Sequence, residues 1–219
     1  MFGFQVIDTN GKGVALDFYN QVYELWYGVW LETYKQLVDQ ENMDSDQFLL
    51  NDYAGVITYN KRPVAMFLMS YFHKDELVNY KRSYLLQYPE GLVENAIRMR
   101  GCERICLYSN ITVHSDFRKN NDFINLNIAE LQFALACSLY EQSNADVLFG
   151  YTRNSKLINS YAYSHGGTPL SVNSVRHNQR VDFIGIYKED LKESSSEDIL
   201  KVVESIFSDN VISIKKSAA

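Results

Sequence analysis

The sequence predicts an α/β (α+β) fold in three layers, with helices on both faces of one mixed sheet. Two observations lead to this prediction. Segments 54–60 and 64–72 are apolar and flank a short turn at Pro63, which is typical of an antiparallel hairpin. Segment 104–151 has the pattern strand, helix, strand, which is typical of a parallel crossover. A sheet that contains both connections is mixed.

The order of the elements follows from their periodicities and breakers. Strands are predicted at 54–60, 64–72, 104–113, 146–151, 172–176 and 181–188. Helices are predicted at 17–40, 75–88, 91–100, 122–142, 155–164 and 199–207. Pro89 ends the second helix, Asp122 is a suitable N-cap for the fourth, and the glycines at 166–167 end the fifth.

Length and composition fit one large domain with an appendage. The chain has 219 residues, 46% of them hydrophobic, so it can bury a substantial core. We expect a domain over 1–190 that includes an N-terminal helical extension. A C-terminal helix and tail are expected over 191–219, with the amphipathic segment 199–207 packed on its own domain or on a partner.

Charge and residue patterns exclude several classes of protein. A net charge of −6 argues against a nucleic-acid surface. The chain lacks both the roughly 18 consecutive apolar residues of a membrane span and the pattern of a secretory signal, so we expect a cytoplasmic protein. The three cysteines form no CxxC pair and the four histidines have no paired-ligand spacing, so we expect buried thiols and no metal site.

A strand end, a basic turn and a helix start meet at VHSDFRKNNDFINL, residues 113–126. Many enzymes hold the phosphates of a cofactor at such a junction, because helix-start N–H groups attract anions. The turn has no glycine, so the residues alone leave open a phosphate site or an ordinary capped helix start. With this segment and with NSKLINSY at 154–161, the chain resembles the GNAT superfamily of N-acyltransferases. The order of the predicted elements from 54 to 188 also fits that family.

The resemblance rests on an ordered set of residues. In the family a long strand ends in Val, then come a His-Pro-Asp-Tyr/Phe-Arg-like turn, a Gly-rich loop and a helix. The matching residues are Val113, His114, Asp116, Phe117 and Arg118, while Ser115 stands where Pro is common. The family also often has Asn and, seven residues later, Tyr on the helix after the next strand, as Asn154 and Tyr161 do.

The resemblance implies a three-layer sandwich around a mixed, mainly antiparallel sheet. It also implies transfer of an acyl group from a thioester, acyl-CoA or acyl-ACP, to an amine. The thioester would bind where two strands splay apart, and backbone N–H groups would stabilise the oxyanion. Tyr161 is the implied catalytic residue, as proton donor to the departing thiolate, although its residue type and spacing also suit core packing. The residues implied to bind the donor are Val113, Arg118, Lys119, Asn121, Phe123 and Asn154.

The chain departs from the family's loop pattern, Gln/Arg-x-x-Gly-x-Gly/Ala, because Asn121 and Phe123 stand at the glycine positions. Asn121 tolerates the left-handed conformation that glycine supplies, but Phe123 is bulky where backbone and phosphate approach each other. The carboxylate of Asp122 would compete for the helix-start N–H groups and repel a pyrophosphate.

Some relatives take the acyl group from acyl carrier protein, including autoinducer synthases and N-acyl amino acid synthases. A weak pyrophosphate site would matter less for such a donor, and Arg118 and Lys119 could face an acidic carrier protein. The Glu-x-x-Arg pattern frequent in those relatives is absent, since Leu107 and Asn110 stand at its positions. Leu107 also replaces the acid that many members use as a base, so no base is assigned.

Three functions stay open at this point. The first is an N-acyltransferase that acts on a small-molecule or peptide amine, with acyl carrier protein as a further partner. The second is a GNAT-like fold without catalysis, used as a binding or regulatory module. The third is an unrelated α+β sensor domain. His114 is read as a base or, preferably, as a residue that caps the turn, and His165 as part of a helix C-cap.

Overall fold

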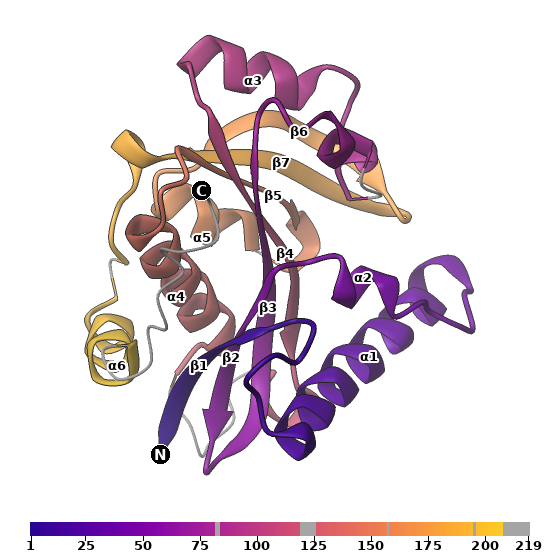
Figure 1. Ribbon diagram of the computed structural model, residues 1–219, viewed down its shortest axis with the longest axis vertical. Helices are drawn as coiled ribbons and strands as arrows, with labels where there is room; N and C mark the ends of the chain where they lie inside the picture. Colours follow the sequence, from indigo (N-terminus) through magenta and orange to yellow (C-terminus); the bar gives the residue numbers. More distant parts are fainter. Residues whose placement is uncertain (82–83, 119–125, 157, 195, 208–219) are drawn as a thin grey trace.

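The strands of the sheet lie in the order β1-β2-β3-β4-β5-β7-β6 in the computed structural model, which describes residues 1–81, 84–118, 126–156, 158–194 and 196–207 (Figure 1). Their bounds are β1 Phe2–Asp8, β2 Tyr53–Tyr59, β3 Arg62–His73, β4 Arg104–Val113, β5 Val147–Arg153, β6 Thr168–Arg176 and β7 Gln179–Tyr187. The pair β4–β5 is parallel, and the other neighbouring pairs are antiparallel. This confirms the mixed, mainly antiparallel sheet and the crossover.

Helices cover both faces of the sheet, which confirms the three layers (Figure 1). On one face lie α1 Leu16–Val38, α2 Asp46–Leu49 and α3 Leu92–Arg100. On the other lie α4 Ile128–Gln142, α5 Ile158–Ser164 and α6 Glu197–Phe207. Apolar residues of each layer are buried against the sheet, which removes their surface from water. None of the described helices is long and apolar enough to cross a lipid bilayer.

Some elements differ from the prediction. The segment 75–88 contains two short 3-10 turns, η1 Leu77–Lys81 and η2 Leu85–Gln87, where one helix was predicted. Strand β1 was not predicted at all, although Phe2, Phe4 and Val6 alternate with other residues. It pairs with β2 along its whole length, and Phe4 is fully buried. The stability of β1 therefore comes from its pairing with β2, a tertiary contact that cannot be predicted from the sequence of the short segment itself.

A β-bulge interrupts the pairing of β4 with β3. Leu68 lies opposite Ser109 and Met66 lies opposite Thr112, so β4 carries one residue more than its partner. Asn110 lies in the bulge and has a left-handed backbone conformation with a φ of 54°. In a regular strand Tyr108 and Asn110 would face the same side. The bulge separates them, so that Tyr108 packs on Phe133 of α4, whereas the Asn110 side chain faces α1.

Helices from both layers hold the bulged strand. From α1, the indole Nε1 of Trp26 donates to Asn110 Oδ1 (3.3 Å), and that of Trp30 donates to Thr112 Oγ1 (3.0 Å). From α4, the buried amide Nε2 of Gln132 donates to the carbonyl oxygens of Met66 (2.7 Å) and Thr112 (2.9 Å). The bonds from Gln132 give a partner to two backbone carbonyl groups beside the bulge, and those from the tryptophans hold two side chains of β4, since buried polar groups need partners.

Replacement of Gln132 by Leu is expected to destabilise the fold. The substitution keeps a similar volume but leaves two buried carbonyl groups without this donor, which costs about 1–3 kcal/mol. Urea denaturation of both forms measures the change in the free energy of unfolding. Gln142→Leu is the control, because Gln142 is exposed at the end of the same helix. Equal losses in the two variants would contradict this role for Gln132.

Candidate functional site

The parallel strands β4 and β5 part soon after they meet. Their pairing covers Ile105 with Val147, Cys106 with Leu148 and Leu107 with Phe149. Both strands continue beyond these pairs, β4 to Val113 and β5 to Arg153, without pairing to each other. We call the point after Leu107 and Phe149 the fork.

A tyrosine hydroxyl bridges the two strands at the fork. Tyr84, just before η2, donates from Oη to the carbonyl oxygen of Tyr108 on β4 (2.9 Å). The Tyr84 hydroxyl oxygen also accepts a hydrogen bond from the backbone N–H of Tyr151 on β5 (3.3 Å). Burial raises the pKa of the Tyr84 hydroxyl, so it keeps the proton that it donates. The hydroxyl therefore replaces the ladder bonds that the parting strands lose.

A cavity of about 940 Å³ opens beyond the fork. From the layer of α4 and α5 it is lined by Asn127 and Tyr161, and from the layer of α1 and α2 by Tyr34 and Asn51. Because residues from both layers line it, the cavity crosses the plane of the sheet where the strands have separated. Its volume lies within the range of ligand-binding pockets.

The lining of this cavity is unusual in charge. The described residues that line it include two arginines, Arg118 and Arg153, and no Asp or Glu. The remaining polar groups are amides and hydroxyls, among them Gln47, Gln87 and Thr152. Within the described part of the chain, no carboxylate is therefore in place to act as a base or to bind a cation, and Leu107 does line the cavity where family members often carry an acid.

Tyr161 lies on α5 and lines the cavity, so the structure does not place it in the closed core. Its hydroxyl oxygen accepts a hydrogen bond from Nδ2 of Asn127 (2.5 Å). An amide donor in this position leaves the phenolic proton free to be donated to another group. Asn127 was not singled out in the sequence, although Asn127 followed by Glu130 has the spacing of a helix N-terminus.

The start of α4 differs from the prediction. The helix begins at Ile128 with Asn127 as its N-cap, so the prediction that Asp122 caps it is wrong. Asn127 Oδ1 accepts the N–H groups of Ala129 (3.1 Å) and Glu130 (3.2 Å). Two of the amide groups that the resemblance assigns to phosphate binding are thus already satisfied by the N-cap.

Val113 and Arg118 also lie at this cavity. Val113 ends β4, and Arg118 follows η3 (Ser115–Phe117) with its Nε donating to the Val113 carbonyl oxygen (2.7 Å). His114 accepts the N–H of Asp116 and so caps the turn, as preferred from the sequence. The other predicted donor-binding residues of this loop, Lys119, Asn121 and Phe123, lie outside the described residues, as does Asp122.

Asn154 forms its hydrogen bonds outside the cavity. It begins η4 (Asn154–Lys156) after β5, and its Nδ2 donates to Asp182 (2.9 Å) on β7. Asn159 and Tyr163 of α5 also donate to the Asp182 carboxylate (3.1 and 2.7 Å). Burial would raise the pKa of Asp182, but these bonds and that from the Asn173 N–H outweigh it and lower the pKa. Asn154 does not line the cavity and instead helps to fix α5, which carries Tyr161.

His165 supports the other end of α5. Its backbone N–H and ring Nδ1 both bond to the Tyr161 carbonyl oxygen (3.1 and 2.8 Å), which agrees with the predicted C-cap. The ring is buried, and burial lowers its pKa from the ordinary 6.5. The neutral ring therefore donates from Nδ1 to the backbone of the candidate catalytic residue.

Comparisons with known proteins reveal similar folds. No protein-family model matches the sequence, and no curated protein matches it. The structure of FeeM, an N-acyl amino acid synthase from uncultured soil microbes, is 10% identical with a TM-score of 0.59, over 87% of this chain and 92% of that chain. BjaI, a CoA-dependent acyl-homoserine lactone synthase with bound SAM and isopentyl-CoA, is 13% identical with a TM-score of 0.57, over 94% of this chain and 89% of that chain.

A mosquito arylalkylamine N-acetyltransferase, like 5b, is 10% identical with a TM-score of 0.61, over 85% of this chain and 100% of that chain. Likeness at these identities shows the fold alone. The protein has the fold of the GNAT N-acyltransferases, as the resemblance implied.

Loss of the Tyr84 hydroxyl is expected to weaken the fork. Tyr84→Phe leaves the Tyr108 carbonyl and the Tyr151 N–H without this partner, which costs about 1–3 kcal/mol of unfolding free energy. Urea denaturation measures the loss. Tyr59→Phe is the control, because that ring, at the end of β2, is partly exposed and packs on Phe2. A loss no greater than that of the control would show that the bridge does not stabilise the fork.

His165 is expected to make stability depend on pH. Because its folded pKa lies below 6.5, the unfolded chain binds the proton more readily. Its contribution is therefore complete above the unfolded pKa and is lost as the pH falls through the folded pKa. Unfolding free energies between pH 8 and about 5 should fall less steeply in His165→Gln than in the parent protein. An unchanged slope, with the more exposed His73→Gln as reference, would contradict this assignment.

Proposed function

We propose that the protein is an N-acyltransferase that moves an acyl group from a thioester donor to an amine. The observation that carries the proposal is the fork, because it opens into a cavity of about 940 Å³ in which Tyr161 presents a hydroxyl held by Asn127. The cavity joins both layers, so a donor and an acceptor can enter from different sides and meet between the strands.

The reaction follows from groups present in the cavity. The amine nitrogen attacks the thioester carbonyl carbon, the carbon–sulfur bond breaks, and the sulfur leaves with its electron pair. Tyr161 gives its phenolic proton to that sulfur, and the amine loses its extra proton to water, because no carboxylate is among the described lining residues. Restoration of the Tyr161 proton from solvent completes the cycle.

The donor is acyl-CoA or the acyl thioester of acyl carrier protein. Arg118 supplies a positive charge at the cavity beside Val113, where a phosphate of either donor could bind. The self-capped start of α4 offers fewer free N–H groups to a pyrophosphate, which favours the carrier-protein thioester. Lys119, Asn121 and Phe123 are proposed to complete this contact.

We also propose that two parts of the chain have different roles. The described residues that line the cavity fall between 29 and 179, so residues 1–190 are proposed to carry the reaction. The segment 191–219 contributes α6, which is buried against β1 and α4 and supports the fold. The three free buried cysteines suit a reducing compartment, and we propose that the protein acts in the cytoplasm.

A second candidate is a binding or regulatory module that does not catalyse. One observation favours it, namely the missing carboxylate in the described lining of the cavity. The two candidates differ in one measurable quantity, the release of free thiol that depends on both donor and amine.

Tyr161→Phe is expected to lower the rate of thiol release by at least about 100-fold, the usual contribution of a general acid. Thiol release is measured with acetyl-, octanoyl- and palmitoyl-coenzyme A and with the same acyl groups on acyl carrier protein, against a panel of amines. Tyr27→Phe is the control, because Tyr27 stacks on Tyr23 of α1 and is not among the described residues that line the cavity. Absence of release with every donor, or full activity in Tyr161→Phe, would contradict the proposed reaction or the proposed role respectively.

A further inference from the structure

The charge of the cavity limits what kind of amine can be the acceptor. The chain has 27 acidic and 21 basic residues, yet the described residues that line the cavity carry two guanidinium groups and no carboxylate. A polycationic amine would meet like charge there, whereas an acceptor with an anionic group would be attracted. One of the two arginines, Arg153, also lines a smaller pocket together with residues of α1 and of the turn between β6 and β7.

Arg153 extends from the end of β5 toward α1. Its Cζ lies 5.5 Å from the centre of the Trp30 ring, and that ring is fixed because Trp30 Nε1 bonds to Thr112 (3.0 Å). The ion pairs among the described residues do not include Arg153. Burial lowers the pKa of Arg153, and the nearby charge of Arg118 acts in the same direction. A partly desolvated cation without a carboxylate is costly and points to a ligand that supplies one.

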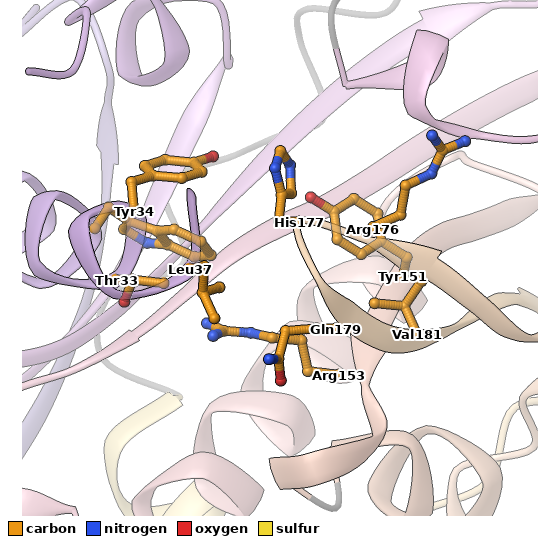
Figure 2. Close-up of a pocket in the computed structure, with 10 residues that line it drawn as sticks. Thr33, Tyr34, Leu37, Tyr151, Arg153, Arg176, His177, Gln179 and Val181 are labelled. Carbon is orange, nitrogen blue, oxygen red and sulfur yellow. The ribbon is translucent and has the colours of Figure 1, made fainter. Parts of the chain in front are cut away.

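A side pocket of about 20 Å³ adjoins the cavity at Arg153 (Figure 2). Tyr34 and Leu37 of α1 form one wall, and His177, in the turn between β6 and β7, forms the other. The two walls are joined, because the Tyr34 and His177 rings lie 5.6 Å apart and Asn178 donates to the Leu37 carbonyl oxygen (2.9 Å). A space of this size holds a small polar group such as a water molecule or a carboxylate.

The potential in the side pocket is positive. Figure 2 shows the Arg153 guanidinium directed toward α1, while that of Arg176 points elsewhere in the same view. Both charges nevertheless act at this place, since the pKa of His177 is lowered by burial and then by Arg176 and Arg153. The described lining of the side pocket contains no Asp or Glu that would cancel them.

We propose that the acceptor is an amine that also carries a carboxylate, as an amino acid does, and that Arg153 binds this carboxylate at the side pocket. The planar guanidinium can form two parallel hydrogen bonds with a carboxylate. This proposal rests on the proposed function in so far as the bound molecule is the acceptor. An anion of the donor would instead meet Arg118, which is bonded to Val113 at the end of β4.

Matched pairs of ligands test the proposal. The pairs are L-phenylalanine and 2-phenylethylamine, L-tryptophan and tryptamine, and L-leucine and isopentylamine, each of which differs by one carboxylate. Dissociation constants are measured by calorimetry for the parent protein, Arg153→Met, Arg153→Lys and Arg180→Met. Methionine keeps an apolar stem over Trp30 without the charge, and Arg180 is an exposed arginine of β7 that does not line the cavity.

The expected result is tighter binding of the amino acid than of its amine in at least one pair, by roughly 10- to 100-fold. Arg153→Met should abolish this preference, Arg153→Lys should keep part of it, and Arg180→Met should keep all of it. The melting temperature of Arg153→Met without ligand should not fall, because a partly desolvated charge without a carboxylate is removed. Amine and amino acid binding equally in every pair, failure of every amino acid to bind, or a preference that survives Arg153→Met would overturn the proposal.

Two further measurements separate this proposal from its neighbours. If Arg153-dependent binding is found but no thiol is released with any donor, the carboxylate site stands and the transfer reaction fails. If thiol is released from all amines without regard to a carboxylate, the reaction stands and the carboxylate site fails. Arg118→Met should weaken binding of pantetheine 4′-phosphate and leave the preference for amino acids in place, and loss of that preference would assign the carboxylate to Arg118.

Discussion

The parting of β4 from β5 is the constraint on which the rest of the structure depends. Two parallel strands can separate inside a protein only if their freed backbone groups find other partners. Tyr84 provides one such partner at the fork, and the bulge at Asn110 turns β4 away from the regular ladder. Trp26, Trp30 and Gln132 then hold the bulged strand from both layers. These polar contacts hold the separated β4 in place at the border of the cavity.

The same arrangement determines the electrostatics of the site. Side chains that border the gap come from strands, helices and turns of both layers, and among the described ones the charged groups are arginines. Acidic groups that the fold does need lie elsewhere, such as Asp182. Three of its hydrogen bonds come from the segment before and within α5, and a fourth comes from the Asn173 N–H on β6. Separating the structural carboxylate from the cavity leaves a positive field where a ligand can bind, in a protein whose net charge is negative.

Much of the fold could be predicted from the sequence, because hydrophobic periodicity marks the hairpin 54–72, the strand 104–113 and most helices. The implied positions of Val113, Arg118 and Tyr161 could be named from the family pattern, and the structure brings these three to one cavity. What could not be predicted depends on tertiary contact. A bulge places the Asn110 side chain on the opposite side of β4 from that of a regular strand. Pairing with β2 stabilises β1. The described lining around Arg153 lacks Asp and Glu because of which residues α1, β5 and β7 bring together there.

The first and last described elements of the chain meet at one edge of the molecule. Phe4 of β1 stacks on Phe207 of α6 with ring centres 6.0 Å apart, and both rings belong to the core beneath α4. Because β1 precedes α6 in the sequence, β1 completes its packing only after α6 has been synthesised. Such long-range contact slows folding and leaves the edge strand uncovered in the meantime. A chain shortened before α6 would expose β1 as a site for aggregation.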